Sequence, residues 1–158
     1  MEINKTDMKK VLIAIDYNPN NEPVVTEGHK LAKLMGAEVC LFHVLSEMRY
    51  YSMQYEPFMG LEGYPIPMDY KLQEEYINVA RTYLEKTATH LNDENVSIHL
   101  AEGDTARRIL EYAEDWGADM IVMGTHSHST LEKIFLGTVA STVLEKTKVP
   151  VYMVPVKV

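Results

Sequence analysis

The sequence predicts an α/β fold with a doubly wound, five-stranded parallel sheet and helices on both faces. Short apolar segments alternate with longer segments of helical periodicity along the 158 residues, beginning and ending with a strand-like segment. Most strand-like segments are continuous apolar runs, as in strands that are buried on both faces of a sheet. Glycines follow two of the helical segments, where helix C-termini are expected. This alternation is typical of an open parallel sheet covered by helices on both sides.

The first two strands and the helix between them have clear boundaries. Residues 11–15 form a continuous apolar run that ends at Asp16. Asn20 or Asn21 can cap the following helix, whose first turn holds Pro23. Gly36 is suited to the left-handed position just after this helix, and residues 39–45 form the second strand.

Residues 46–68 form an irregular segment rich in tyrosine, methionine and proline. Its three prolines and two glycines are incompatible with a long helix. A connection of this length is usually a lid, a contact surface or disordered. We expect it to cover apolar surface or to pack at a subunit contact rather than to form a lid.

A long helix is predicted from the cap at Asp69 to about Asn92. Residues 96–100 alternate apolar and polar side chains, which indicates a half-exposed edge strand. Asp104 can cap the next helix, and Gly117 ends it. The apolar face of the long helix consists of Leu72, Tyr76, Ala80, Tyr83, Ala88 and Leu91.

The last three elements are a strand at residues 120–123, a helix that runs from Thr138 to about Lys146, and a final strand. Val139, Ala140, Val143 and Leu144 are predicted to be the buried residues of this helix. The final strand begins at Val149 and ends at Val156, and its two prolines fit an edge position. No linker or repeat interrupts residues 1–158, so a single domain is expected.

Composition excludes several classes of protein. The net charge of −8 disfavours nucleic-acid binding, which requires a basic face. No apolar run approaches the length of a membrane span, and residues 1–10 lack the apolar core of a signal peptide. The single cysteine, Cys40, lies in an apolar run and is expected to be a small buried side chain. A cytoplasmic protein is therefore expected.

Two glycines suggest a phosphate-binding site. Gly124 ends a buried strand, where it lets the backbone turn sharply, and Gly137 opens a helix, where an anion can approach backbone N–H groups. Residues 138–141 contain no Asp or Glu that would compete with an anion. The alternative is a simple glycine turn with Thr138 as a helix cap. Asp16, Val44 and Gly124 follow or end three strands, so a switch-point crevice can bring them together.

These residues give the chain a resemblance to the universal stress protein family over essentially its whole length. The nucleotide motif of that family is glycine, two residues, glycine, nine residues, glycine, and then serine or threonine. The same spacing occurs here from Gly124 through Ser127 to Gly137 and Thr138, with Ser127 in place of the middle glycine. Residues 11–16, 43–44, 118–126 and 148–151 also look like the family.

The resemblance implies strand order 3-2-1-4-5, binding of ATP, with Mg²⁺ as its companion ion, and a homodimer that pairs the last strands, residues 149–156. It places adenosine or its metal near Asp16 and adenine near Val44. Taken without the resemblance, Asp16 is equally a local turn residue and Val44 a core residue. The nucleotide-binding residues implied are Asp16, Val44, Gly124, Thr125, His126, Ser127, Gly137, Thr138, Val139 and Ala140.

Ser127 leaves two functions open, because one branch of the family binds ATP through the full motif and another lacks the glycines and does not. If position 127 requires a positive φ, serine costs roughly 1–2 kcal/mol. If φ is negative, Ser127 keeps its N–H group and adds a hydroxyl donor. The first hypothesis is an ATP-binding module that acts through partners, and the second is an interaction module without nucleotide.

The sequence contains no recognisable catalytic set. Ser127 has no base at a defined spacing, and neither a Walker loop nor a GxGxxG motif is present. His126 and His128 form a weak metal pattern without Cys or acidic partners, and are expected to be solvated loop residues. A slow ATP hydrolase is a third hypothesis, and no catalytic or metal-ligating residue is predicted.

Overall fold

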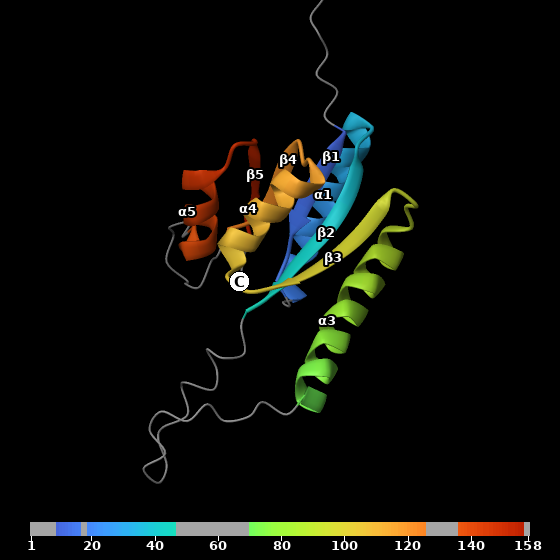
Figure 1. Cartoon of the computed structure of the whole chain (residues 1–158). Helices are drawn as coiled ribbons and strands as arrows, with labels where there is room; N and C mark the ends of the chain where they lie inside the picture. Colours follow the sequence, from blue (N-terminus) through green and yellow to red (C-terminus); the bar gives the residue numbers. More distant parts are fainter. Residues whose placement is uncertain (1–8, 17–18, 47–69, 126–135, 157–158) are drawn as a thin grey trace, which may run out of the picture.

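The computed structural model describes residues 9–16, 19–46, 70–125 and 136–156, in which strands and helices alternate as predicted (Figure 1). The strands are β1 (Lys10–Ala14), β2 (Glu38–Leu45), β3 (Val96–Glu102), β4 (Met120–Gly124) and β5 (Val151–Val154). The helices are α1 (Glu22–Met35), α3 (Tyr70–Leu91), α4 (Thr105–Trp116) and α5 (Gly137–Lys146), and a 3₁₀ turn, η1 (Pro19–Asn21), precedes α1.

All strand pairs are parallel, and their order is β3-β2-β1-β4-β5, which confirms the predicted topology. β1 lies at the centre, where Ile13 is in register with Leu41 of β2 and Val122 of β4. The chain moves outward from β1 in one direction through β2 and β3, and in the other through β4 and β5. The switch point therefore lies between β1 and β4, at the carboxyl ends of the strands.

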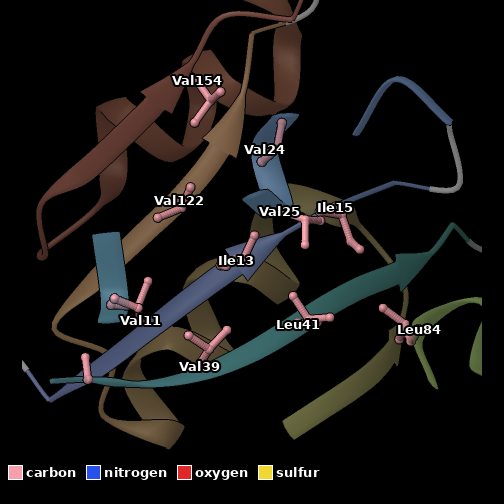
Figure 2. Close-up of a cluster of buried hydrophobic side chains, with 12 residues drawn as sticks. Val11, Ile13, Ile15, Val24, Val25, Val39, Leu41, Leu84, Val122 and Val154 are labelled. Carbon is pink, nitrogen blue, oxygen red and sulfur yellow. The ribbon is translucent and has the colours of Figure 1, made fainter. Parts of the chain in front are cut away.

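Two hydrophobic layers cover the two faces of the sheet. Val11 and Ile13 of β1 pack with α1 and Leu84 of α3 on one face, as Figure 2 shows. Leu12 of β1 faces the opposite side and packs with α4 and α5. Because side chains alternate along a buried strand, each central strand contributes to both layers.

The helix ends largely confirm the sequence analysis. Gly36 and Gly117 adopt left-handed conformations after α1 and α4, with φ of 66° and 73°. The Asp104 side chain caps α4 by accepting a hydrogen bond from the N–H of Arg107 at 2.9 Å. Asn21 occupies the cap position of α1 but makes no side-chain cap bond there. The predicted capping role of Asn21 is therefore wrong, since its amide contacts Asp16 instead.

Two predictions about α5 and β5 need correction. β5 spans only Val151–Val154 rather than residues 149–156, although its edge position is confirmed. Leu144 of α5 is exposed and Val139 is only partly buried, whereas Ala140 and Val143 belong to the core. Fewer apolar side chains of the ten-residue α5 are buried against the sheet than the sequence predicts.

The predicted apolar face of α3 is also only partly used by the core. Ala80 and Leu84 are buried, but Leu72 and Tyr76 in the first half of the helix are exposed. α3 packs on β2 and β3, and Figure 1 shows its N-terminal end on the side of the sheet where the strands terminate. The exposed side chains of Leu72 and Tyr76 belong to this N-terminal half of α3 and are not packed in the core.

None of the helices in the described part of the chain has the length and apolar character needed to span a membrane. Residues 47–68 of the predicted irregular segment, and the predicted cap Asp69, lie outside the described residues.

Candidate functional site

A cavity of about 380 Å³ opens at the carboxyl ends of the strands, at the switch point between β1 and β4. Of the ten site residues that the sequence predicts, eight line this cavity. His126 and Ser127 lie outside the described residues. The eight are Asp16, Val44, Gly124, Thr125, Gly137, Thr138, Val139 and Ala140.

Asp16 is held at the cavity wall by a contact with Asn21. The Asn21 side chain is buried, and its amide donates to the backbone oxygen of Asp16 at 2.6 Å and to the Asp16 carboxylate. Asp16 itself is exposed to the cavity and to solvent. The buried amide thus fixes the direction of a carboxylate that remains accessible to a ligand.

His43 lines the cavity and links β2 to the end of β1. Its side chain is almost fully buried, and Nδ1 lies 2.7 Å from the carbonyl oxygen of Ile15. Because a carbonyl oxygen only accepts hydrogen bonds, Nδ1 carries a proton and donates it. In the sequence, His43 stands out only as part of the family resemblance, because residue spacing does not indicate this hydrogen bond.

Thr125 links the end of β4 to the chain after β5. Its backbone N–H donates to the oxygen of Val154 at 3.0 Å, and its hydroxyl oxygen accepts from the N–H of Val156 at 3.1 Å. The hydroxyl retains its own proton as a donor. Thr125 therefore lines the cavity while its backbone and hydroxyl oxygen hold two strand ends together.

The N-terminus of α5 faces the cavity without a side-chain cap. The cap position is Leu136, which makes no side-chain cap bond, and the first turn contains no acidic residue. Thr138 lies inside the helix, so the alternative in which it acts as the cap is wrong. Gly137 has φ of 75°, a conformation that favours glycine, and it directs the chain into the helix. Backbone N–H groups and the positive end of the helix dipole are thus presented to the cavity.

Gly124 is required for a different reason from the one the sequence suggests. Its φ is not among the positive values found for glycines in the described chain, so a sharp left-handed turn is not its role. A Cβ atom at Gly124 would lie 2.8 Å from Val156 Cγ2 and 2.9 Å from Val24 Cγ2. Glycine therefore lets α1 and the chain after β5 approach the end of β4 closely.

The cavity also has walls that the sequence motifs did not include. Tyr76 of α3 and Thr105 and Ile109 of α4 line it. Helical periodicity predicts that Tyr76 faces the core, because periodicity does not reveal where a helix passes the end of a sheet. Among the described lining residues Asp16 is the acidic one, and none is Lys or Arg.

The described residues contain no cluster of three or more His, Cys, Asp or Glu side chains that could hold a metal ion. Among the described residues that line the cavity, Asp16 offers a metal ion one carboxylate, and a bound molecule could supply further ligands. Mg²⁺ is commonly bound in this way, through one or two carboxylates and the phosphates of a substrate.

A sequence profile of the universal stress protein family matches residues 8–155 of the chain. The chain belongs to the universal stress protein family. This membership places it among stress-response proteins, in agreement with the strand order observed in the sheet.

Individual relatives cover nearly the whole chain. The universal stress protein MJ0531 of Methanocaldococcus jannaschii is 32% identical over 149 residues, which cover 92% of this chain and 81% of that protein. The solved structure of MJ0577 from the same organism is 26% identical, with a TM-score of 0.73 over 96% of this chain and 99% of that one. A universal stress protein solved in complex with cAMP shares the fold, with 17% identity, a TM-score of 0.59, and coverage of 92% and 95% of the two chains.

Gly124→Ala should destabilise the protein by about 1–3 kcal/mol, because the added methyl group overlaps two valine side chains. Urea unfolding of the single and double variants tests this cause. In a Val156→Ala background the cost of Gly124→Ala should be smaller, since one of the two overlaps is removed. Equal costs in both backgrounds would contradict the role assigned to Val156.

Proposed function

We propose that this protein binds ATP together with Mg²⁺ in the cavity at the strand ends, and acts in the stress response by changing its partner interactions with nucleotide state. The observation that carries this proposal is the N-terminus of α5, which has no acidic residue and no side-chain cap and opens onto a cavity. Such a helix end supplies backbone donors and a positive potential for phosphate groups.

The size and lining of the cavity support a small-molecule ligand. Its volume of about 380 Å³ falls in the range of roughly 300–1,000 Å³ that is usual for small-molecule sites. Val44, at the end of β2, provides an apolar contact for a base, and α5 provides the phosphate end. Eight of the ten residues that the family resemblance implies line this one cavity of suitable size, which supports the proposal.

The Asp16 carboxylate is a reason to expect that the cavity binds ATP as its Mg²⁺ complex rather than as the metal-free anion. An aspartate beside a triphosphate is repulsive unless a cation lies between them. The described lining residues supply no Lys or Arg for this purpose. The Asp16 carboxylate, oriented by Asn21, would be a Mg²⁺ ligand together with phosphate oxygens.

The polar groups of the cavity favour binding over catalysis. His43 is buried and its Nδ1 proton is donated to Ile15, and the hydroxyl oxygen of Thr125 accepts from Val156. Neither arrangement is a nucleophile paired with a base. We therefore expect ATP hydrolysis to be slow or absent.

Calorimetric titration of the purified protein with Mg-ATP should give a dissociation constant below the millimolar range. Asp16→Asn should weaken binding by about 10- to 100-fold, as expected for losing a charged ligand contact. Removing Mg²⁺ with EDTA should lower the ATP affinity of the wild type much more than it lowers the ATP affinity of the Asp16→Asn variant. Asp115→Asn on α4 makes the same change in net charge away from the cavity and is the control. Absence of binding by the wild type at millimolar Mg-ATP would refute the proposed function.

Ser127 is the specific observation in favour of the second candidate function, an interaction module without nucleotide. If serine at this position prevents binding, Ser127→Gly should create or greatly strengthen Mg-ATP affinity. The loss of roughly 1–2 kcal/mol of backbone strain corresponds to about 5- to 30-fold. Similar Mg-ATP affinities of the variant and the wild type would rule out this second candidate.

We propose in addition that two copies pair along the edge strand β5. β5 has a hydrogen-bonded neighbour, β4, on one side, and Tyr152 at its centre is 41% exposed. Tyr152→Lys should shift a dimer toward monomer in analytical ultracentrifugation, because charged side chains block edge pairing and a two-fold axis would bring two lysines together. Leu34→Lys alters an exposed leucine of α1 and should leave the dimer intact. A monomeric wild type would contradict the pairing.

A further inference from the structure

We infer that Tyr76 of α3 stacks on the base of the nucleotide, an inference that rests on the function proposed above. The family motif includes no residue of α3. Tyr76 nevertheless lines the same cavity as Val44 and the start of α5. It approaches the cavity from the face of the sheet that α3 covers, whereas α5 lies on the opposite face.

The Tyr76 side chain is not buried in the core of the protein. It is 45% exposed, whereas Ala80 and Leu84, one and two turns further along α3, are 3% and 0% exposed. The buried part of α3 therefore begins one turn after Tyr76. A large aromatic ring that is exposed at a cavity wall gains burial when a planar ligand enters.

The other aromatic side chains of the described lining are engaged in the fold. Phe42 is fully buried, and its ring stacks on Tyr112 with the centroids 4.9 Å apart. The His43 ring is buried and hydrogen-bonded to Ile15. Among the rings of Phe42, His43 and Tyr76, the ring of Tyr76 is the one with a large accessible surface.

The position of Tyr76 matches the base end of the cavity rather than the phosphate end. α3 packs against β2, and β2 carries Val44 at its carboxyl end. Phosphate groups are drawn to the start of α5, which belongs to the opposite layer of the fold. A nucleotide that extends between these two ends would place its base between the end of β2 and α3.

Stacking of a base on an aromatic side chain tolerates any base, because every base has a π-face. Removal of the ring typically lowers affinity by about 5- to 150-fold. The phenol hydroxyl is not needed for stacking, so phenylalanine should replace tyrosine. The contact would therefore raise affinity for nucleotides as a class rather than select adenine alone.

Calorimetric titration of the purified protein with Mg-ATP and with Mg-tripolyphosphate, which has no base, tests this inference. Tyr76→Ala should weaken Mg-ATP binding by about 5- to 150-fold and leave tripolyphosphate binding unchanged. Tyr76→Phe should bind Mg-ATP like the wild type. Val79→Ala is the matched control, because Val79 lies on the same helix with 51% exposure and does not line the cavity.

Three results would overturn the inference. The first is an unchanged Mg-ATP affinity of Tyr76→Ala in a protein whose wild type binds Mg-ATP. The second is an equal loss for Mg-ATP and tripolyphosphate, which would indicate a general change in the site rather than loss of a base contact. The third is a wild type that binds no Mg-ATP, which would remove the proposed function and this inference with it.

Discussion

The candidate site depends on the central position of β1, which is hydrogen-bonded to β2 on one side and to β4 on the other. The helix that follows β1 and the helix that follows β4 lie on opposite faces of the sheet, and a cavity opens between the carboxyl ends of these strands. Three side-chain contacts keep these strand ends together. Asn21 binds the segment after β1, His43 joins β2 to β1, and Thr125 joins β4 to the chain after β5.

The two glycines of the motif satisfy different physical requirements. At Gly124 the requirement is space, since two valine side chains lie where a Cβ atom would be. At Gly137 it is backbone conformation, since φ is 75°. Both requirements serve the same end, because the first brings the end of β4 close to α1 and the second turns the start of α5 toward the cavity. A motif that looks uniform in sequence thus combines a packing constraint with a conformational one.

The sequence was sufficient for the elements and for the two-sided burial of the sheet, because continuous apolar runs and the glycines after helices are local signals. With the family resemblance it also named eight of the residues that line the cavity. The sequence was insufficient where the role of a side chain depends on how helices and strands pack against one another. Asn21 looked like a cap but binds Asp16, and Leu144 looked buried but is exposed. Tyr76 fitted the apolar period of α3, yet the period cannot show that this part of the helix lies beyond the sheet. The strand order followed from the family resemblance rather than from any single residue.

The division of polar groups at the cavity also limits what the site can do. His43 and the hydroxyl oxygen of Thr125 are engaged in holding strand ends, whereas Asp16 and the start of α5 remain accessible. Among these described groups none forms a nucleophile paired with a base, which agrees with the proposed binding function. A binding module influences its partners only to the extent that the ligand favours one conformation or complex over another. A nucleotide would therefore favour one conformation or complex through its contacts with Asp16 and the start of α5, which are accessible, rather than through the buried groups.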